Sequence, residues 1–159
     1  MLQLPPLSLY IHIPWCVQKC PYCDFNSHAL KQNVPETDYV AALLADLNND
    51  LAYVQNRQLQ SIFIGGGTPS LISAQGYQWL FTQLKAVLAF EDDCEITLEA
   101  NPGTVEHDPF ADYLAAGINR LSIGVQSFNT EHLKKLGRIH SNDDAIAAIG
   151  LAREAGFQR

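Results

Sequence analysis

The sequence predicts an α/β fold in which a parallel sheet carries its helices on the outside. Two observations predict it. Strand-like apolar runs alternate with helix-like stretches, which gives four β–α units in series along 159 residues. The stretches richest in cysteine, glycine and polar residues each follow directly after a predicted strand. Because ligands bind at the carboxyl edge of a parallel barrel, this placement indicates a single domain with one functional edge.

The first unit begins with the apolar run Leu7–Ile13, which is typical of a strand. The following helix is expected to start near Pro35, because proline is favoured in the first turn. Its apolar face repeats at helical spacing and comprises Val40, Leu43, Leu44, Leu47, Leu51 and Val54.

The second unit pairs a strand at Gln60–Ile64, which leads into three glycines, with a helix that Ser73 can cap. The apolar stripe of this helix is Leu80, Leu84 and Leu88. The third unit combines a strand at Glu95–Leu98 with a short helix at about Asp108–Ala116, which Gly117 would end.

The fourth unit begins with a strand at Leu121–Val125. Asn129 is expected to cap a short helix that stops at Gly137. Ser141 and Asp144 then have the spacing of a capping box, which would open a last helix that ends at Gly156.

Composition excludes some classes of partner. The chain has 17 acidic and 10 basic residues, for a formal charge of −7. Nucleic acids and anionic membranes demand clustered Lys and Arg, so neither is expected as the main partner. No apolar run reaches the roughly 18 residues of a membrane span, and the first residues lack the basic region of a secretory signal. Closely spaced thiols then indicate a reducing, cytoplasmic setting.

Three cysteines, Cys16, Cys20 and Cys23, follow the first predicted strand within eight residues. Such spacing is typical of a metal site or an iron–sulfur cluster. Structural or disulfide-bonded cysteines are one alternative. A zinc site that recruits Cys94 as the fourth ligand is another, although Cys94 also suits a small buried position on a strand. Three thiolates without a local fourth ligand favour a [4Fe–4S] cluster with one open iron.

The C-x3-C-x2-C pattern resembles the signature of the radical S-adenosylmethionine superfamily. Four further blocks narrow the resemblance to the branch that contains the oxygen-independent coproporphyrinogen III dehydrogenases and the heme chaperones. They are Tyr10-Ile11-His12-Ile13-Pro14-Trp15, Gly65-Gly66-Gly67-Thr68-Pro69-Ser70, Glu99-Ala100-Asn101-Pro102-Gly103 and Gly124-Val125-Gln126-Ser127. The resemblance implies that residues 1–159 are the N-terminal portion of one partial (β/α)6 barrel, with the remaining barrel and a C-terminal domain absent.

The resemblance also implies the cofactors. Cys16, Cys20 and Cys23 would bind three irons, and S-adenosylmethionine would chelate the fourth. In active members of the superfamily, an electron from the cluster cleaves the sulfonium and generates a 5′-deoxyadenosyl radical. The cofactors supply that chemistry, and the protein supplies position and exclusion of water.

Further site residues are carried over from the family motif. Tyr10, Gly66 and Glu99 match positions at the cluster-bound S-adenosylmethionine. Tyr22, Gly67, Thr68, Gln126 and Arg138 match positions at a second cofactor in the dehydrogenases. Each has a plainer alternative: a glycine turn, a sheet-packing aromatic for Tyr10, a solvated charge for Glu99, and surface polarity for Gln126 and Arg138. His12 is expected to be a satisfied strand histidine, and His140 is not assigned to the site.

One residue separates the two branches. The dehydrogenases carry another cysteine two positions after the third cluster cysteine, where this chain has Phe25. Phenylalanine resembles the heme chaperones. The resemblance therefore implies a protein that binds heme, passes it to acceptor hemoproteins and forms a homodimer when full length. Oxidative decarboxylation of porphyrinogen propionates is the alternative, and a radical enzyme on another substrate is a third.

Overall fold

Four parallel strands form the central sheet of the computed structural model, which describes residues 3–31, 33–102 and 108–159. The strands lie side by side in the order β1–β4–β5–β6 and span Leu7–Ile13, Leu59–Gly66, Phe90–Ala100 and Arg120–Ile123. Each strand pairs in parallel with the next β-strand of the sheet along the chain. This sequential order is that of a barrel wall, and it confirms the predicted parallel α/β fold.

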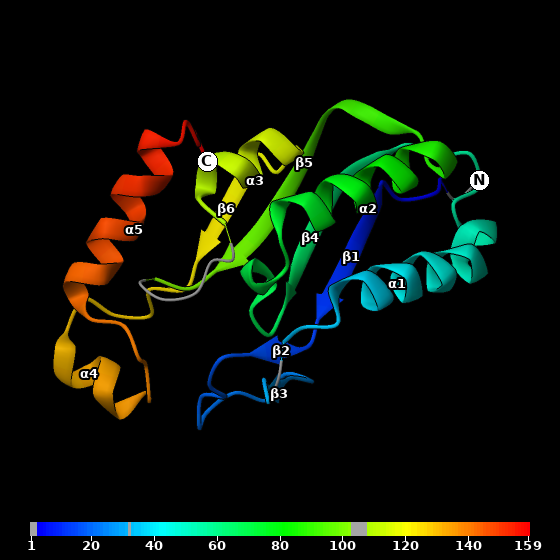
Figure 1. Ribbon diagram of the computed structural model, residues 1–159. Coiled ribbons are helices and arrows are strands. Elements are labelled where there is room, and N and C mark those ends of the chain that lie inside the picture. Colours follow the sequence, from blue (N-terminus) through cyan, green and yellow to red (C-terminus); the bar gives the residue numbers. More distant parts are fainter. Residues whose placement is uncertain (1–2, 32, 103–107) are drawn as a thin grey trace.

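Helices cover one face of this sheet in the same order as the strands (Figure 1). The covering helices are α1 (Glu36–Asp50), α2 (Ala74–Val87), α3 (Phe110–Ala116) and α5 (Asn142–Glu154), with 3-10 turns η1 (Leu51–Tyr53) and η2 (Pro69–Leu71). The short helix α4 (Thr130–Lys135) lies beyond the carboxyl ends of the strands (Figure 1). Among the described helices, none is long and apolar enough to cross a membrane.

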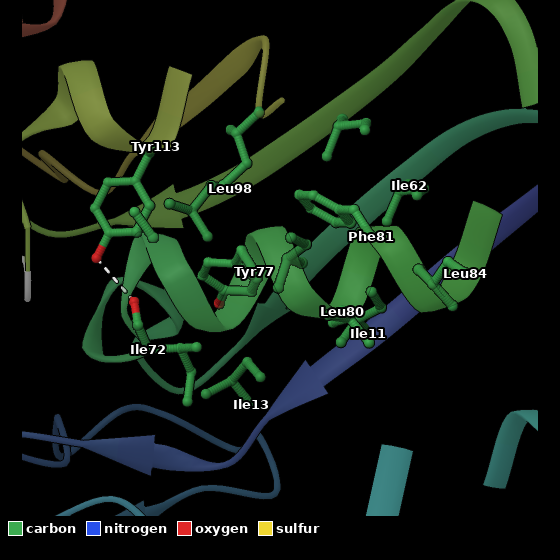
Figure 2. Packing of buried hydrophobic residues seen from close by; sticks show 14 of the residues in the cluster. Ile11, Ile13, Ile62, Ile72, Tyr77, Leu80, Phe81, Leu84, Leu98 and Tyr113 are labelled. Atoms are coloured by element: carbon green, nitrogen blue, oxygen red, sulfur yellow. Dashed lines mark hydrogen bonds between the residues drawn. The ribbon is translucent and has the colours of Figure 1, made fainter. Parts of the chain in front are cut away.

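The core lies between the sheet and the helix layer. Alternate strand residues such as Ile11, Ile62 and Leu98 point toward α2, whose buried stripe includes Leu80 and Leu84 (Figure 2). Deeply buried tyrosines sit where α2 and α3 approach η2. The hydroxyl of Tyr113 donates to the Ile72 carbonyl at 2.9 Å, so its polar end is satisfied inside the core.

The predicted helix caps are confirmed. Ser73 caps α2 by accepting from the Gly76 amide, and Asn129 caps α4. Ser141 and Asp144 form the expected capping box at α5. Gly117 ends α3 in the left-handed conformation at φ 111°, which a glycine adopts without a steric penalty.

Several boundaries differ from the prediction, among them the starts of β5 and α3 and the end of β6. Strand β5 begins at Phe90 rather than Glu95, because Phe90 pairs with Leu59 of β4. The acidic residues 91–93, which separate Phe90 from the predicted start, belong to the strand. Strand β6 ends at Ile123 rather than Val125. Helix α3 begins at Phe110 rather than Asp108, and the Asp108 carboxylate instead accepts from the Ala74 amide at 2.7 Å.

A second, two-stranded sheet was not predicted. It pairs β2 (Trp15–Cys16) in parallel with β3 (His28–Ala29) and closes the cysteine-bearing loop into a compact unit. Figure 1 shows this small sheet and α4 at the same end of the molecule, the end to which the arrowheads of the four main strands point. The carboxyl edge is therefore built from the loops that the sequence singled out.

Candidate functional site

A cavity of about 390 Å³ opens at the carboxyl ends of the strands. This volume is within the usual range for small-molecule sites. All of the predicted site residues except Tyr10 line it: Cys16, Cys20, Tyr22, Cys23, Gly66, Gly67, Thr68, Glu99, Gln126 and Arg138. Residues separated by more than a hundred positions therefore meet at one place.

The three cysteines are free and are not equivalent. Cys16 is buried on β2, where its carbonyl accepts from the Leu30 amide at 2.7 Å. Cys20 and Cys23 are half-buried and lie on one turn. A hydrogen bond of ordinary length closes this turn, in which the Cys23 amide donates to the Cys20 carbonyl at 3.0 Å. Thus one thiol is anchored in the small sheet, while the other two face the cavity from a turn.

Glycines at the end of β4 hold this loop against the main sheet. The Gly67 amide donates to the Ile13 carbonyl at 2.7 Å, and the Thr68 amide donates to the Trp15 carbonyl at 2.6 Å. A Cβ at Gly67 would collide with the Trp15 carbonyl. The expected role of these glycines was close approach to a ligand. The structure shows that Gly67 is first required for close approach to the backbone that precedes Cys16.

Cys94 does not join the other cysteines. It is buried in the hydrophobic core toward the start of β5, six residues before Ala100 at the carboxyl end. Six residues of strand span about 20 Å, so the zinc site that uses Cys94 as a fourth ligand is wrong. Within the described ranges, no group of three or more His, Cys, Asp or Glu side chains is gathered around a single ion position.

Arg138 connects the cysteine turn to the ends of two strands. One terminal nitrogen donates to the Cys20 sulfur at 3.4 Å, and the other donates to the Asn101 side chain at 2.5 Å and to the Gly124 carbonyl at 2.8 Å. Asn101 in turn donates to the Thr68 hydroxyl at 3.3 Å. The sequence analysis does not assign Asn101 to the site. Its position directly after β5, within the Glu99-to-Gly103 motif, could have indicated it.

Glu99 projects from β5 into the cavity, where the Gly66 amide donates to its carboxylate at 3.3 Å. Burial raises the pKa of Glu99 above its ordinary value, and the Gly66 hydrogen bond opposes that rise. A cationic partner stabilises a desolvated carboxylate that has only one hydrogen-bond donor. The Glu99 side chain can therefore accept an ammonium group or hydroxyl groups of a ligand.

Tyr10 lies on the sheet face away from the helices and outside the cavity lining. Its ring stacks on Phe63 with centroids 6.3 Å apart, and its hydroxyl is 2.8 Å from His12 Nδ1. His12 Nε2 in turn lies 2.7 Å from the Asn26 carbonyl, so both ring nitrogens have partners. Burial raises the pKa of Tyr10, and the charge of Glu99 adds to this rise. Tyr10 therefore lies close enough to feel the charge of Glu99 but is not part of the cavity wall.

Gln126 follows β6 and is held at φ 64°, in the left-handed region that few non-glycine residues adopt. Its side chain lies beside Gly124 at the cavity wall. Behind this loop, the buried His140 contacts the Val125 carbonyl through Nε2 at 3.0 Å. Burial lowers the pKa of His140, as does the charge of Arg138. Gly103, the last residue of the Glu99 motif, lies outside the described residues.

A cysteine triplet that follows the first strand of a parallel β/α sheet defines the class of protein. The family model of the radical SAM superfamily matches residues 10–159, so the chain belongs to that superfamily. Family membership implies a [4Fe–4S] cluster and S-adenosylmethionine. The residues present fit this pair: three free thiols share a cavity large enough for a small molecule, and the half-buried Glu99 carboxylate, with room for a cationic partner, faces it.

Within the superfamily, the chain is similar to particular proteins. It is 63% identical over 158 residues to the heme chaperone HemW of Escherichia coli (strain K12), which covers 99% of this chain and 42% of that protein. It is 40% identical to HemW of Bacillus subtilis (strain 168), over 95% of this chain and 40% of the relative. The chain thus spans about two fifths of the length of these curated relatives.

A solved structure shares the fold closely. Coproporphyrinogen III oxidase (HemN) from Escherichia coli, described as a radical SAM enzyme, superposes with a TM-score of 0.83 at 33% identity. The match covers 96% of this chain and 35% of that one. This likeness confirms the expected partial barrel of the coproporphyrinogen dehydrogenase-like branch.

Proposed function

We propose that this chain is the N-terminal part of the radical SAM core of a heme chaperone. In this proposal, Cys16, Cys20 and Cys23 hold a [4Fe–4S] cluster and Glu99 and Gly66 face S-adenosylmethionine at its open iron. The complete protein, with the rest of its barrel and a C-terminal domain, binds heme and transfers it to acceptor hemoproteins. It forms a homodimer and works in the cytoplasm.

The shared cavity carries the proposal for the cluster. The three reduced thiols of one loop, the glycine-rich end of β4 and the half-buried carboxylate of Glu99 on β5 converge there, at one edge of the sheet. A cubane cluster supplies one-electron chemistry or a structural centre, depending on what reaches its open iron. The chain's own residues would position the cluster and exclude water from it.

Phe25 and the relatives support the chaperone reading. Relatives that are 63% and 40% identical over nearly the whole chain are both named heme chaperones. Phe25 lines the mouth of the cavity and is 62% exposed. An aromatic ring at this position cannot bind iron or deliver a thiol, whereas the dehydrogenases carry a cysteine there. An exposed ring beside the cluster instead offers an apolar contact to a flat ligand such as heme.

The structural likeness to HemN favours a second candidate, a porphyrinogen-decarboxylating enzyme. The two candidates differ in whether S-adenosylmethionine is cleaved during turnover. Both place the same three cysteines on the cluster, so iron content alone does not separate them. The deciding measurement must therefore follow heme binding and radical chemistry in one preparation.

The test uses the full-length protein, reconstituted anaerobically with iron and sulfide. Heme binding is measured by absorbance titration, heme transfer by reconstitution of an apo-hemoprotein, and S-adenosylmethionine cleavage by 5′-deoxyadenosine after reduction with coproporphyrinogen III present. The triple variant Cys16→Ala, Cys20→Ala, Cys23→Ala is the cluster control. Cys94→Ala is its matched single-thiol control, because Cys94 lies in the core away from the cavity.

Stoichiometric heme binding and transfer without decarboxylation is the expected result. Protoporphyrinogen formation that depends on the cluster would instead assign the enzymatic function. If the triple variant retained as much iron and sulfide as the wild type, the cluster assignment would be wrong. The Cys94 variant should keep its full iron content.

A further inference from the structure

Arg138 has an arrangement that a ligand-binding arginine would not need. Its two terminal nitrogens are already engaged by Cys20, Asn101 and Gly124, at 3.4, 2.5 and 2.8 Å respectively. Its Nε is buried and has no hydrogen-bond partner among the described residues. The fork that would bind a carboxylate bidentately is therefore used inside the protein.

The backbone around Arg138 is fixed against the same cysteine turn. The Arg138 amide donates to the Leu133 carbonyl at 2.9 Å, which ties it to α4. Gly137 is in the left-handed conformation at φ 68°, and a Cβ there would approach Pro21 Cδ to 2.8 Å. The Gln18 side chain donates to the Gly137 carbonyl at 3.5 Å. Gly137 and Arg138 thus both contact the loop that carries the thiols.

These contacts close a ring of hydrogen bonds around the cavity. Starting at Cys20, the ring runs through Arg138 to Asn101 at the end of β5, and through Asn101 to Thr68 at the end of β4. The Thr68 amide then returns to the Trp15 carbonyl, directly before Cys16. A displacement of any of the strand ends would consequently be felt at the cysteine turn.

We propose that Arg138 is a positioning residue for the iron–sulfur cluster, acting on it through the Cys20 sulfur. This inference rests on the proposed cluster site. Arg138 distinguishes Cys20 from the other two ligands: the nearest recorded partner of the Cys23 sulfur is the Ser27 hydroxyl at 4.0 Å. The inference replaces the role at a second cofactor that the family resemblance implied for this arginine.

The expected consequence is a higher reduction potential. Reduction adds one negative charge to the cluster and its thiolates. A guanidinium that donates to one of those sulfurs stabilises the reduced form more than the oxidised form, because the added charge interacts with it favourably. The same hydrogen bonds hold the Cys20 side chain in place, so they should also slow the loss of iron.

The test compares Arg138→Gln with Arg138→Lys in the reconstituted full-length protein. The reduction potential is followed by electron paramagnetic resonance during a redox titration, and iron loss is followed as absorbance decay with an excess of chelator. Arg138→Gln removes the charge, so the potential should fall and iron should be lost about 10-fold faster. Arg138→Lys keeps the charge but not the fork, so the potential should stay nearer the wild-type value while iron loss still accelerates.

Two further variants keep the test decisive if Arg138→Gln folds poorly. Asn101→Ala leaves the arginine in place but removes one of the two partners of its second terminal nitrogen, which keeps only the Gly124 carbonyl, and it should shift the potential in the same direction by less. Arg120→Lys is the matched control, because Arg120 contacts Glu95 and Thr97 on the sheet and does not line the cavity. It should change neither readout.

An unchanged potential in Arg138→Gln and Asn101→Ala would overturn the inference, as would weaker S-adenosylmethionine binding in Arg138→Gln with wild-type cluster properties. A wild-type protein that assembles no [4Fe–4S] cluster would overturn both this inference and the proposed site. A wild-type protein that holds the cluster but binds no heme would refute only the chaperone function. In that case, a lowered potential in Arg138→Gln would still support the role of Arg138.

Discussion

Gln126 combines a strained backbone with a place in the cavity wall, and the two can be separated by mutation. A non-glycine residue in the left-handed region costs about 1 kcal/mol, and glycine escapes that cost at the expense of a more flexible unfolded chain. We expect Gln126→Gly to be more stable than Gln126→Ala by about 1 kcal/mol. Urea unfolding of the cofactor-free full-length variants measures the difference.

Both Gln126 variants lack the side-chain amide that lines the cavity, so if this amide contacts a ligand there, both should bind S-adenosylmethionine with similarly reduced affinity. Calorimetric titration of the cluster-loaded variants checks this. Equal stabilities would show that the left-handed conformation relaxes without cost. Wild-type affinity in both would remove the Gln126 amide from the list of ligand contacts, and its polarity would then be that of an ordinary surface residue.

Glu99 should make the stability of the cofactor-free protein fall as the pH rises. Burial raises the pKa of its carboxyl group in the folded state. The unfolded chain therefore releases this proton at a lower pH than the folded chain does. Between the ordinary value and the raised one, each increment of pH favours unfolding. Glu99→Gln should remove this component and be more stable than the wild type at neutral pH.

Urea unfolding at a series of pH values from 3 to 8 tests the Glu99 expectation, with the difference between variant and wild type disappearing at the acidic end. Glu131→Gln is the matched control, because Glu131 is exposed on α4 and contacts only Lys134 through its side chain among the recorded interactions. The same Glu99→Gln change should weaken S-adenosylmethionine binding. A variant that is less stable than wild type at neutral pH would contradict the argument.

Residue identity could be predicted better than residue partnership. The cysteines directly follow the first strand and Glu99 stands at the end of β5, so their places in the sequence indicated them, whereas Arg138 was indicated only by the family resemblance. The sequence did not indicate that Arg138 is held by Asn101, because that contact joins positions 37 residues apart. Nor could it place Tyr10, whose side chain points to the open face of the sheet rather than to the cavity. Successive side chains of a strand point to opposite faces of the sheet, so the direction of Tyr10 follows only once it is known which face the helices cover.

The second element of the sheet, β4, ends in glycines that act in packing. A side chain at Gly67 would meet the Trp15 carbonyl, and backbone cannot move aside as a flexible side chain can. We expect Gly67→Ala to destabilise the protein by about 2 kcal/mol and to lower its iron content on reconstitution, because the loop before Cys16 is displaced. Thermal unfolding and iron analysis measure the two effects.

Gly150 is the matched control for this glycine substitution. It lies in the middle of α5, and a Cβ there would meet nothing within 4 Å. Gly150→Ala should therefore raise the stability by about 0.5–1 kcal/mol, since alanine is the better helix former. If Gly67→Ala were as benign as Gly150→Ala, the proposed packing role of the β4 terminus would be refuted.

Elements with a local signal were predicted nearly to the residue. Helices α2, α4 and α5 carry their caps in the sequence, and β1 has its predicted bounds. Pairings set by distant partners were not predicted. Strands β2 and β3 pair residues that lie 13 positions apart in the sequence. Each strand has only two residues, which is too short to show a periodic pattern. The early start of β5 likewise depends on β4.

At the scale of the whole molecule, one face of the sheet is covered and the other is not. The helices cover the face that bears Ile11, Ile62 and Leu98, whereas Tyr10 and Phe63 stand exposed on the opposite face. Inside a complete barrel this second face would be enclosed. The outer edge of β6 has also gained a neighbour, because the Leu121 amide donates to the Arg159 carbonyl at 3.3 Å. The segment after α5 therefore approaches β6 where a further strand would pair.

Helix α5 also carries an uncovered apolar surface. Its alanines, including Ala145 and Ala148, are buried, while Ile146 and Ile149 are exposed about one turn apart on one side. Apolar neighbours at this spacing form a stripe that a further helix can cover. In the 159-residue chain, we expect Ile146→Lys to leave the stability within about 0.5 kcal/mol of wild type and to reduce concentration-dependent association.

In the full-length protein, the same substitution should have the opposite consequence. If the rest of the barrel covers this side of α5, a lysine at position 146 must be desolvated or displace its neighbour, and the free energy of unfolding should fall by about 2 kcal/mol. Urea unfolding and sedimentation velocity of both chains measure the pair of effects. Lysine at the solvent-exposed position of Gln78 on α2 is the control, because helix α2 is already flanked by α1 and α3. A full-length Ile146→Lys protein as stable as the wild type would show that this stripe faces solvent in the complete molecule, and that the barrel continues over the other flank of α5.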